Sequence, residues 1–184
     1  MILVVGATAA EVEYLDGAST LVCGIGPVEA ALATAAGLAE RPVGGVLHVG
    51  IAGAKELPPP ALVIGSESVY SDVVDPASVF PRITRIGADP GLVDAARAAL
   101  PAAHVLPIGT SGRVGGGADC DVEAMEGFGV LRAAALAGVP AVELRAVSNA
   151  VTERDRSRWR IEEALGMLAV AVPILLDALE AHVA

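Results

Sequence analysis

Short apolar runs and longer alanine-rich stretches alternate along most of the chain, with polar or glycine-rich breaks between them. The short runs are rich in β-branched residues and predict strands at residues 1–6, 19–23, 43–50, 61–74, 104–110 and 141–147. The longer stretches contain strong helix formers and predict helices at residues 28–40, 90–100, 130–137 and 161–182. Strands that alternate with helices are typical of an α/β domain.

The composition adds that the core is built from small aliphatic side chains. Of the 184 residues, 54% are hydrophobic but only 3% are aromatic, and this length predicts one domain spanning residues 1–184. The longest apolar run, residues 164–176, contains Gly166 and Pro173 and ends at Asp177. It is shorter than the roughly 20 residues that span a bilayer, so no membrane insertion is expected.

The net charge and the cysteine content indicate which ligands and which cellular location to expect. A net charge of −10 would repel a nucleic acid backbone, so a small-molecule partner is expected instead. Cys23 and Cys120 are too few for a disulfide framework, and their surroundings indicate no metal site. Residues 1–5 lack the basic segment and cleavage site of a signal peptide, and we expect a cytoplasmic protein.

Acidic and amide side chains that could take part in catalysis lie near the ends of predicted strands. Residues 121–149 place Glu123 and Glu126 before a helix and Asn149 at the end of a strand, and open α/β sheets bind ligands at such ends. Glu11 follows the first strand. On the residues alone, the favoured interpretation of Glu11 is an acid in the first turn of a helix. Glu123 and Glu126 could be surface acids on one helical face.

Glycine-rich turns give weaker signals. Gly24 and Gly26 precede a helix, but Glu29 stands where a dinucleotide-binding fingerprint needs a small residue, so a tight turn explains them. His48 lies within an apolar strand and is interpreted as structural. Residues 111–119 predict a flexible connection, with a backbone nest or a lid as alternatives.

An arginine cluster follows Asn149 in an otherwise acidic chain. It could bind a carboxylate, or it could be a solvated helix start whose arginines pair with nearby acids. Its members are Arg154, Arg156, Arg158 and Arg160, with Trp159 among them.

The segments VEAMEG and GVPAVELRAVSN, joined by the alanine-rich helix, resemble the nucleoside phosphorylase and nucleosidase superfamily, and within it the futalosine hydrolases of menaquinone biosynthesis. GATAAEVEYL, GIGPVEAALATA, HVGIAGA and ERDRSRWRIEEAL extend the resemblance over most of the chain, whereas residues 71–118 depart from it. The resemblance implies a three-layer α/β/α sandwich with a mixed central sheet. It also implies a homo-oligomer that needs no cofactor.

The resemblance implies roles for individual residues. Glu11 would orient the attacking water, Glu126 would hold the ribose hydroxyls, and Asn149 would bind the leaving purine. Met125 would line the sugar pocket, and the backbone of Gly24 and Gly26 would approach the ribose or phosphate region.

Two further residues bear on the substrate. Ile51 lies in a loop where related phosphorylases hold phosphate with an arginine and a hydroxyl, which implies that water is the nucleophile. Arg154 would anchor the carboxyphenyl tail of futalosine. Related nucleosidases stack an aromatic residue on the purine from a segment equivalent to residues 111–119, and this chain has none there.

The implied activity is hydrolysis of the N-ribosidic bond of futalosine, which releases hypoxanthine and dehypoxanthine futalosine. Asn149 replaces the aspartate of adenine-specific relatives and implies a 6-oxopurine. The alternatives are a methylthioadenosine/S-adenosylhomocysteine nucleosidase, a purine nucleoside phosphorylase, and a noncatalytic nucleoside-binding module.

Overall fold

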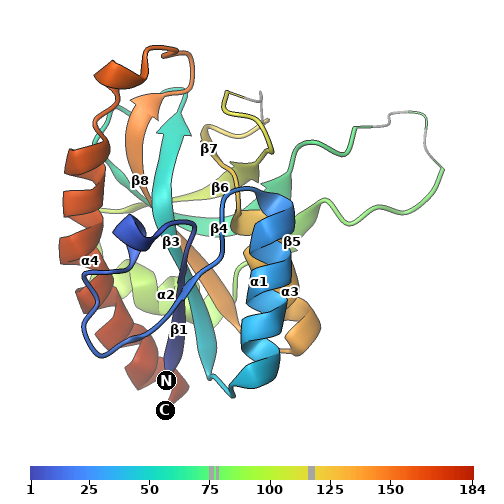
Figure 1. The fold of residues 1–184 in the computed structure, drawn as a ribbon, viewed down its shortest axis with the longest axis vertical. Coiled ribbons are helices and arrows are strands. Elements are labelled where there is room, and N and C mark those ends of the chain that lie inside the picture. The colour runs from blue at the N-terminus through green and yellow to red at the C-terminus, as the bar shows by residue number, and fades with distance from the viewer. Residues whose placement is uncertain (75–76, 78, 116–118) are drawn as a thin grey trace.

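A computed structural model describes residues 1–74, 77, 79–115 and 119–184, and part of the glycine-rich segment 111–119 lies outside them (Figure 1). The strands are β1 (Ile2–Gly6), β2 (Ser19–Val22), β3 (Gly45–Ala54), β4 (Leu62–Tyr70), β5 (Arg85–Gly87), β6 (His104–Thr110), β7 (Val122–Ala124) and β8 (Ala141–Ala150). The helices are α1 (Pro27–Glu40), α2 (Pro90–Ala99), α3 (Gly127–Ala137) and α4 (Ile161–Val183), with two 3-10 turns, η1 (Ala9–Glu11) and η2 (Arg156–Arg158).

The strands form one mixed sheet, as expected. Its order is β2-β1-β3-β7-β6-β4-β5, and β8 pairs with both β3 and β4. The pairs β1 with β2, β1 with β3, and β3 with β8 are parallel. Strand β8 is antiparallel to β4, and β7 is antiparallel to β3. The carboxyl ends of β1, β3 and β8 therefore meet at one edge of the sheet.

Helices cover both faces of the sheet, which confirms the three-layer architecture. Figure 1 shows α1 and α3 on one side and α4 on the other. One core cluster joins Val4, Leu47 and Leu144 of the sheet to α2 and α4. A second cluster joins Leu3 and Val5 to α1 and α3.

Local sequence signals set the helix ends. Helix α1 starts at Pro27, directly after Gly26, whose φ of 96° is positive. Proline suits this first position because its ring fixes a helical φ. The Asp89 side chain caps α2 by accepting a hydrogen bond from the Leu92 N–H at 3.0 Å. Helix α3 ends at Gly138, whose φ of 70° is left-handed.

Helix α4 is longer than the apolar run that predicts it. With 23 residues and a mean hydropathy of 1.9 in its most apolar window, it is long and apolar enough to cross a membrane, contrary to the expectation from residues 164–176. However, its buried stripe, which includes Leu168, Leu175 and Leu179, packs into the same core as the sheet. This is the arrangement of an amphipathic helix that covers a sheet.

Strands β3 and β8 are longer at their carboxyl ends than the sequence predicts, and β4 is shorter. Strand β3 continues to Ala54 and β8 to Ala150, so the residues 51–54 and 148–150 are strand rather than loop. Strand β4 ends at Tyr70, and the described residues 71–74 after it and 79–84 before β5 extend away from the body of the domain (Figure 1).

Candidate active site

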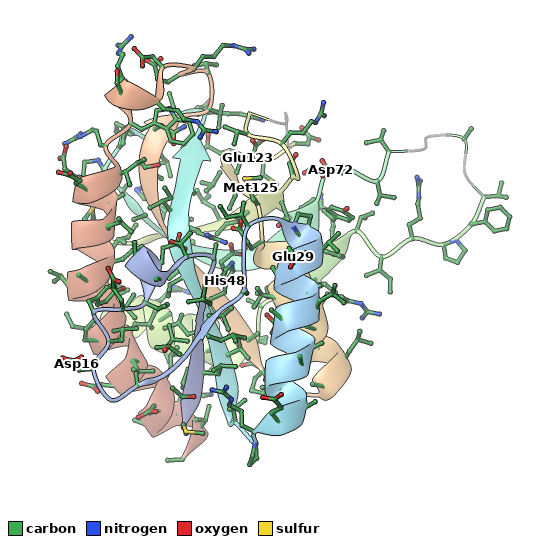
Figure 2. The ribbon with its side chains drawn as sticks, viewed as in Figure 1. Asp16, Glu29, His48, Asp72, Glu123 and Met125 are labelled. Atoms are coloured by element: carbon green, nitrogen blue, oxygen red, sulfur yellow. The ribbon has the colours of Figure 1, made fainter. Side chains whose placement is uncertain are left out.

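A cavity of about 440 Å³ opens at the edge where β1, β3 and β8 end. Its walls come from the segment after β1, the end of β3, the β7–α3 junction, the end of β8 and the start of α4. Figure 2 places Glu123 and Met125 near this end of the sheet, with His48 deeper along it. The volume lies within the range of about 300–1,000 Å³ that small-molecule sites occupy.

Glu11 forms one wall of the cavity. It is the last residue of η1 and is only 6% exposed. Its Oε2 accepts hydrogen bonds from the Thr8 backbone N–H at 2.9 Å and from the Thr8 hydroxyl at 3.2 Å. Its Oε1 accepts one from the Ile51 N–H at 3.2 Å. Glu11 is therefore both an acid in a helical turn and a cavity residue, and these bonds fix its carboxylate.

Glu126 approaches the same cavity from the start of α3. It occupies the N-cap position and is 5% exposed. Its Oε1 accepts a hydrogen bond from the Gly26 N–H at 3.1 Å, and its Oε2 lies 3.4 Å from Nη2 of Arg145. Glu123 belongs to β7 and is also buried, so the alternative that both acids lie on an exposed helical face is wrong.

The glycine turn before α1 therefore positions a carboxylate. Gly26 binds Glu126 through its N–H, and Ile25, between the two glycines, lines the cavity. Neither Gly24 nor Gly26 is among the described residues that line it.

The two glutamates belong to a group that the sequence did not reveal, the buried charge cluster of Glu11, His48, Glu126, Glu143 and Arg145. Arg145 donates from Nε to Glu143 Oε1 at 2.7 Å and from Nη1 to the Ile51 carbonyl at 3.4 Å. Its Nη2 contacts His48 Nε2 as well as Glu126. One guanidinium thus links both walls of the cavity.

His48 is structural, as interpreted from the sequence. Its Nδ1 lies 2.8 Å from the Val5 carbonyl, which can only accept, so Nδ1 carries the proton and Nε2 accepts from Arg145. Complete burial and the adjacent guanidinium of Arg145 hold the pKa of His48 well below its ordinary value. His48 is therefore neutral.

The register of β3 and β8 explains the cluster. His48 pairs with Glu143 and Gly50 pairs with Arg145, so these residues lie side by side on the face that α1 and α3 cover. Gly50 leaves the space that the guanidinium fills, since a Cβ there would lie 2.2 Å from Nη1 of Arg145.

Asn149 lies at the end of β8, and its amide is held in a defined orientation. Its Nδ2 donates to the Ala150 carbonyl at 2.9 Å, and its Oδ1 accepts from the Ser148 hydroxyl at 2.8 Å. Because a carbonyl only accepts, this assigns oxygen and nitrogen of the amide and leaves one N–H and one lone pair for a ligand. A register shift between Ala52 and Gly53 lets Ser148 and Asn149 both line the cavity.

Of the remaining predicted site residues, some line the cavity and one does not. Met125 and Ile51 line the cavity, whereas Arg154 is exposed and is not among the described lining residues. Arg156 does line it, with its guanidinium 5.5 Å from the centre of the Trp159 ring, which lines it too. The residue spacing could not distinguish Arg154 from Arg156, because this irregular segment has no periodicity.

The other two arginines of the segment pair with acids, as the alternative interpretation of the cluster expected. Arg158 lies 3.0 Å from Glu153, and Arg160 pairs with Glu163. Arg156 has no ion-pair partner in the part of the chain that the structure describes.

The aromatic residues and cysteines contribute little to the cavity. Among the described lining residues, Trp159 is the one aromatic side chain, and Val114 and Gly115 line the cavity from the segment 111–119. Cys23 and Cys120 are both unpaired and buried. The described residues contain no group of three or more His, Cys, Asp or Glu that could hold a metal ion.

Comparisons with known proteins show the family of this chain. A family model described as the phosphorylase superfamily matches residues 15–183. A futalosine hydrolase of Streptomyces coelicolor is 38% identical over 190 residues, which cover 90% of this chain and 81% of the relative. One from Thermus thermophilus is 34% identical over 181 residues, which cover 83% and 78%.

Solved structures share the fold. A futalosine hydrolase mutant of Helicobacter pylori superposes with a TM-score of 0.87 at 20% identity, covering 96% of this chain and 98% of that one. A methylthioadenosine/S-adenosylhomocysteine nucleosidase of Colwellia psychrerythraea, in complex with adenine, gives 0.84 at 22% identity, covering 99% and 95%.

Proposed function

Because this chain belongs to the futalosine hydrolases of the phosphorylase superfamily, we propose that it hydrolyses the N-ribosidic bond of futalosine, a step of menaquinone biosynthesis. The observation that carries the proposal is the convergence of Glu11 and Glu126 on one cavity, linked by Arg145 beneath it. Two fixed carboxylates suit a reaction whose transition state is an oxocarbenium-like sugar.

In the proposed reaction the bond between C1′ of the ribose and the base nitrogen breaks, and its electron pair leaves with hypoxanthine. Glu126 accepts hydrogen bonds from the ribose hydroxyls and stabilises the positive sugar. Glu11 orients a water whose oxygen bonds to C1′, and it takes the proton that this water loses. N7 of the base takes a proton from solvent, so that hypoxanthine leaves neutral, and the proton that Glu11 takes from the water returns to solvent. Asn149 accepts a hydrogen bond from the N7–H and donates one to O6.

Water rather than phosphate is the proposed nucleophile. The end of β3, residues 49–54, presents no arginine or hydroxyl side chain to an oxyanion. The nearby guanidinium of Arg145 is already bonded to Glu143, Glu126, His48 and the Ile51 carbonyl.

Arg156 is the proposed anchor for the carboxylate of the substrate tail, in place of Arg154. It is the one cationic side chain among the described residues that line the cavity, and it lies over the Trp159 ring. A planar guanidinium can bind a carboxylate through two hydrogen bonds, and the tryptophan adds an apolar surface for an aryl group.

We also propose that the enzyme is a cytoplasmic homo-oligomer. The β4–β5 connection exposes Val79 (90%) and Phe80 (77%), and α1 exposes Val28 (64%) and Leu32 (65%), apolar side chains that a second copy of the chain could cover. Light scattering of the purified protein measures the subunit number, and a monomer at micromolar concentration would contradict the proposal. Cell fractionation tests the location.

The activity is tested by incubation with futalosine, inosine and methylthioadenosine, with and without phosphate, followed by chromatography. We expect free hypoxanthine and dehypoxanthine futalosine, at a rate that does not depend on phosphate. A sugar phosphate product would identify a phosphorylase, and faster release of adenine from methylthioadenosine would identify the other nucleosidase class. Saturable binding without turnover would identify a binding module.

A further inference from the structure

We propose that Glu143 is a positioning residue for the reaction: it holds the Arg145 guanidinium by Nε and offsets its charge, so that Glu11 and Glu126 keep their reactive geometry. Glu143 is not among the described residues that line the cavity, so a substrate bound there would not touch it. The inference rests on the roles proposed above for Glu11 and Glu126.

The Nε atom and the two Nη atoms of the Arg145 guanidinium bind different partners. Glu143 accepts from Nε at 2.7 Å, the shortest of the Arg145 contacts to a carboxylate. The two Nη atoms are then directed to Glu126, the Ile51 carbonyl and His48. The Ile51 peptide completes the link, because its N–H donates to Glu11. Movement of the guanidinium would therefore reach both walls of the cavity.

The surroundings of Glu143 indicate that its charge, rather than its packing, is what the site uses. Its side chain is fully buried, and its Oε2 has no hydrogen-bond partner within the described part of the chain. A buried carboxylate oxygen without a partner lowers stability. Gly127 makes room for it, since a Cβ there would lie 2.3 Å from Oε2. A buried ion pair can often be replaced as a whole by packed apolar side chains without loss of stability, so the pair of Glu143 and Arg145 is not needed for packing.

The titratable groups around the pair of Glu143 and Arg145 come from several elements. They are neutral His48 on β3, Glu126 before α3, Glu11 in η1 and the Cys23 thiol after β2. Burial opposes the charged form of Arg145, but Glu143, Glu126 and Glu11 outweigh it and raise the pKa of Arg145. Burial raises the pKa of Glu143, and the guanidinium opposes that shift. Without Glu143, the whole charge of Arg145 would act on the two cavity glutamates.

The test is Glu143→Gln in the full-length enzyme, with kcat and KM for futalosine measured across pH. The amide keeps an acceptor for Nε but carries no charge. We expect kcat to fall by roughly tenfold or more, with KM little changed. We expect the acid limb of the kcat profile to move to lower pH by about one unit, because an uncompensated cation favours ionised neighbours.

A matched control is Leu144→Val, the next residue of β8, whose side chain lies in the core on the opposite face of the sheet. It should lower thermal stability and leave the pH profile unmoved. A folded Glu143→Gln enzyme with the wild-type profile and kcat would overturn the proposal.

Should the amide variant not fold, Glu143→Asp keeps the charge and shortens the side chain by one methylene. It should lower kcat while the acid limb stays in place, and a wild-type kcat would also overturn the proposal. Failure of the proposed function is separate, because it would appear as absent turnover of futalosine by the wild-type enzyme.

Discussion

Gly50 is the position where one added methyl group should damage the site most directly. In Gly50→Ala the new Cβ would lie 2.2 Å from Nη1 of Arg145 and 2.7 Å from Oε1 of Glu11. Ordinary contact begins at 3.4 Å, so the guanidinium would have to retreat by about 1.2 Å. Gly50 lies in the middle of β3 and does not have a positive φ, so alanine fits its backbone and only the side-chain clash operates.

The magnitudes follow from that displacement. Overpacking a closely packed interior costs about 1–3 kcal/mol, and a misplacement of about 1 Å in a catalytic group costs roughly a hundredfold in rate. For a domain of this size, we expect Tm to fall by about 2–12 °C. We also expect kcat for futalosine to fall roughly a hundredfold.

The assay compares thermal unfolding and steady-state kinetics of Gly50→Ala, wild type and a control, Gly166→Ala. Gly166 is an exposed position of α4 where a Cβ would meet nothing within 4 Å. Alanine there should raise stability by about 0.5–1 kcal/mol and leave kcat unchanged. Wild-type turnover by a folded Gly50→Ala enzyme would show that the position of Arg145 does not matter to the reaction.

Three other predictions concern side chains of the cavity. Glu11→Gln and Glu126→Gln should each lower kcat by at least about a hundredfold in a folded protein, as measured by hypoxanthine release; near-normal turnover would remove that residue from the mechanism. Asn149→Asp should shift kcat/KM from futalosine toward its 6-amino analogue by about 10- to 100-fold, and an unchanged ratio would show that Asn149 does not read the base. Arg156→Gln should raise KM for futalosine but not for inosine, which has no carboxylate tail; an equal effect of Arg154→Gln would refute a specific anchor.

Much of the fold could be predicted because strands and helices are encoded locally. The buried run of β1 and the Gly138 stop of α3 are both readable from the sequence. The placement of Glu11 and Asn149 at strand ends follows from the same pattern. Their meeting at one cavity then follows from the parallel arrangement of β1, β3 and β8.

The buried charge cluster could not be predicted from that pattern. Glu143 and Arg145 alternate with apolar residues, as on a strand with one wet face, yet both are almost completely buried. Alternation identifies which residues share a face, but it does not tell whether a helix covers that face. The side-chain contact between Arg145 and His48 of β3 depends on strand register, which the sequence of neither strand reveals alone.

The buried charge cluster also has a consequence for how the enzyme folds. Its contacts join residues far apart in the chain: Gly26 and Glu126 are 100 positions apart, and His48 and Arg145 are 97 apart. Contacts of such long range form late, after the loop-closure entropy of the intervening chain has been overcome. In refolding experiments, helical circular dichroism should therefore recover before hypoxanthine release does, and simultaneous recovery would contradict this order. Regained turnover would then report completed folding, which regained secondary structure does not.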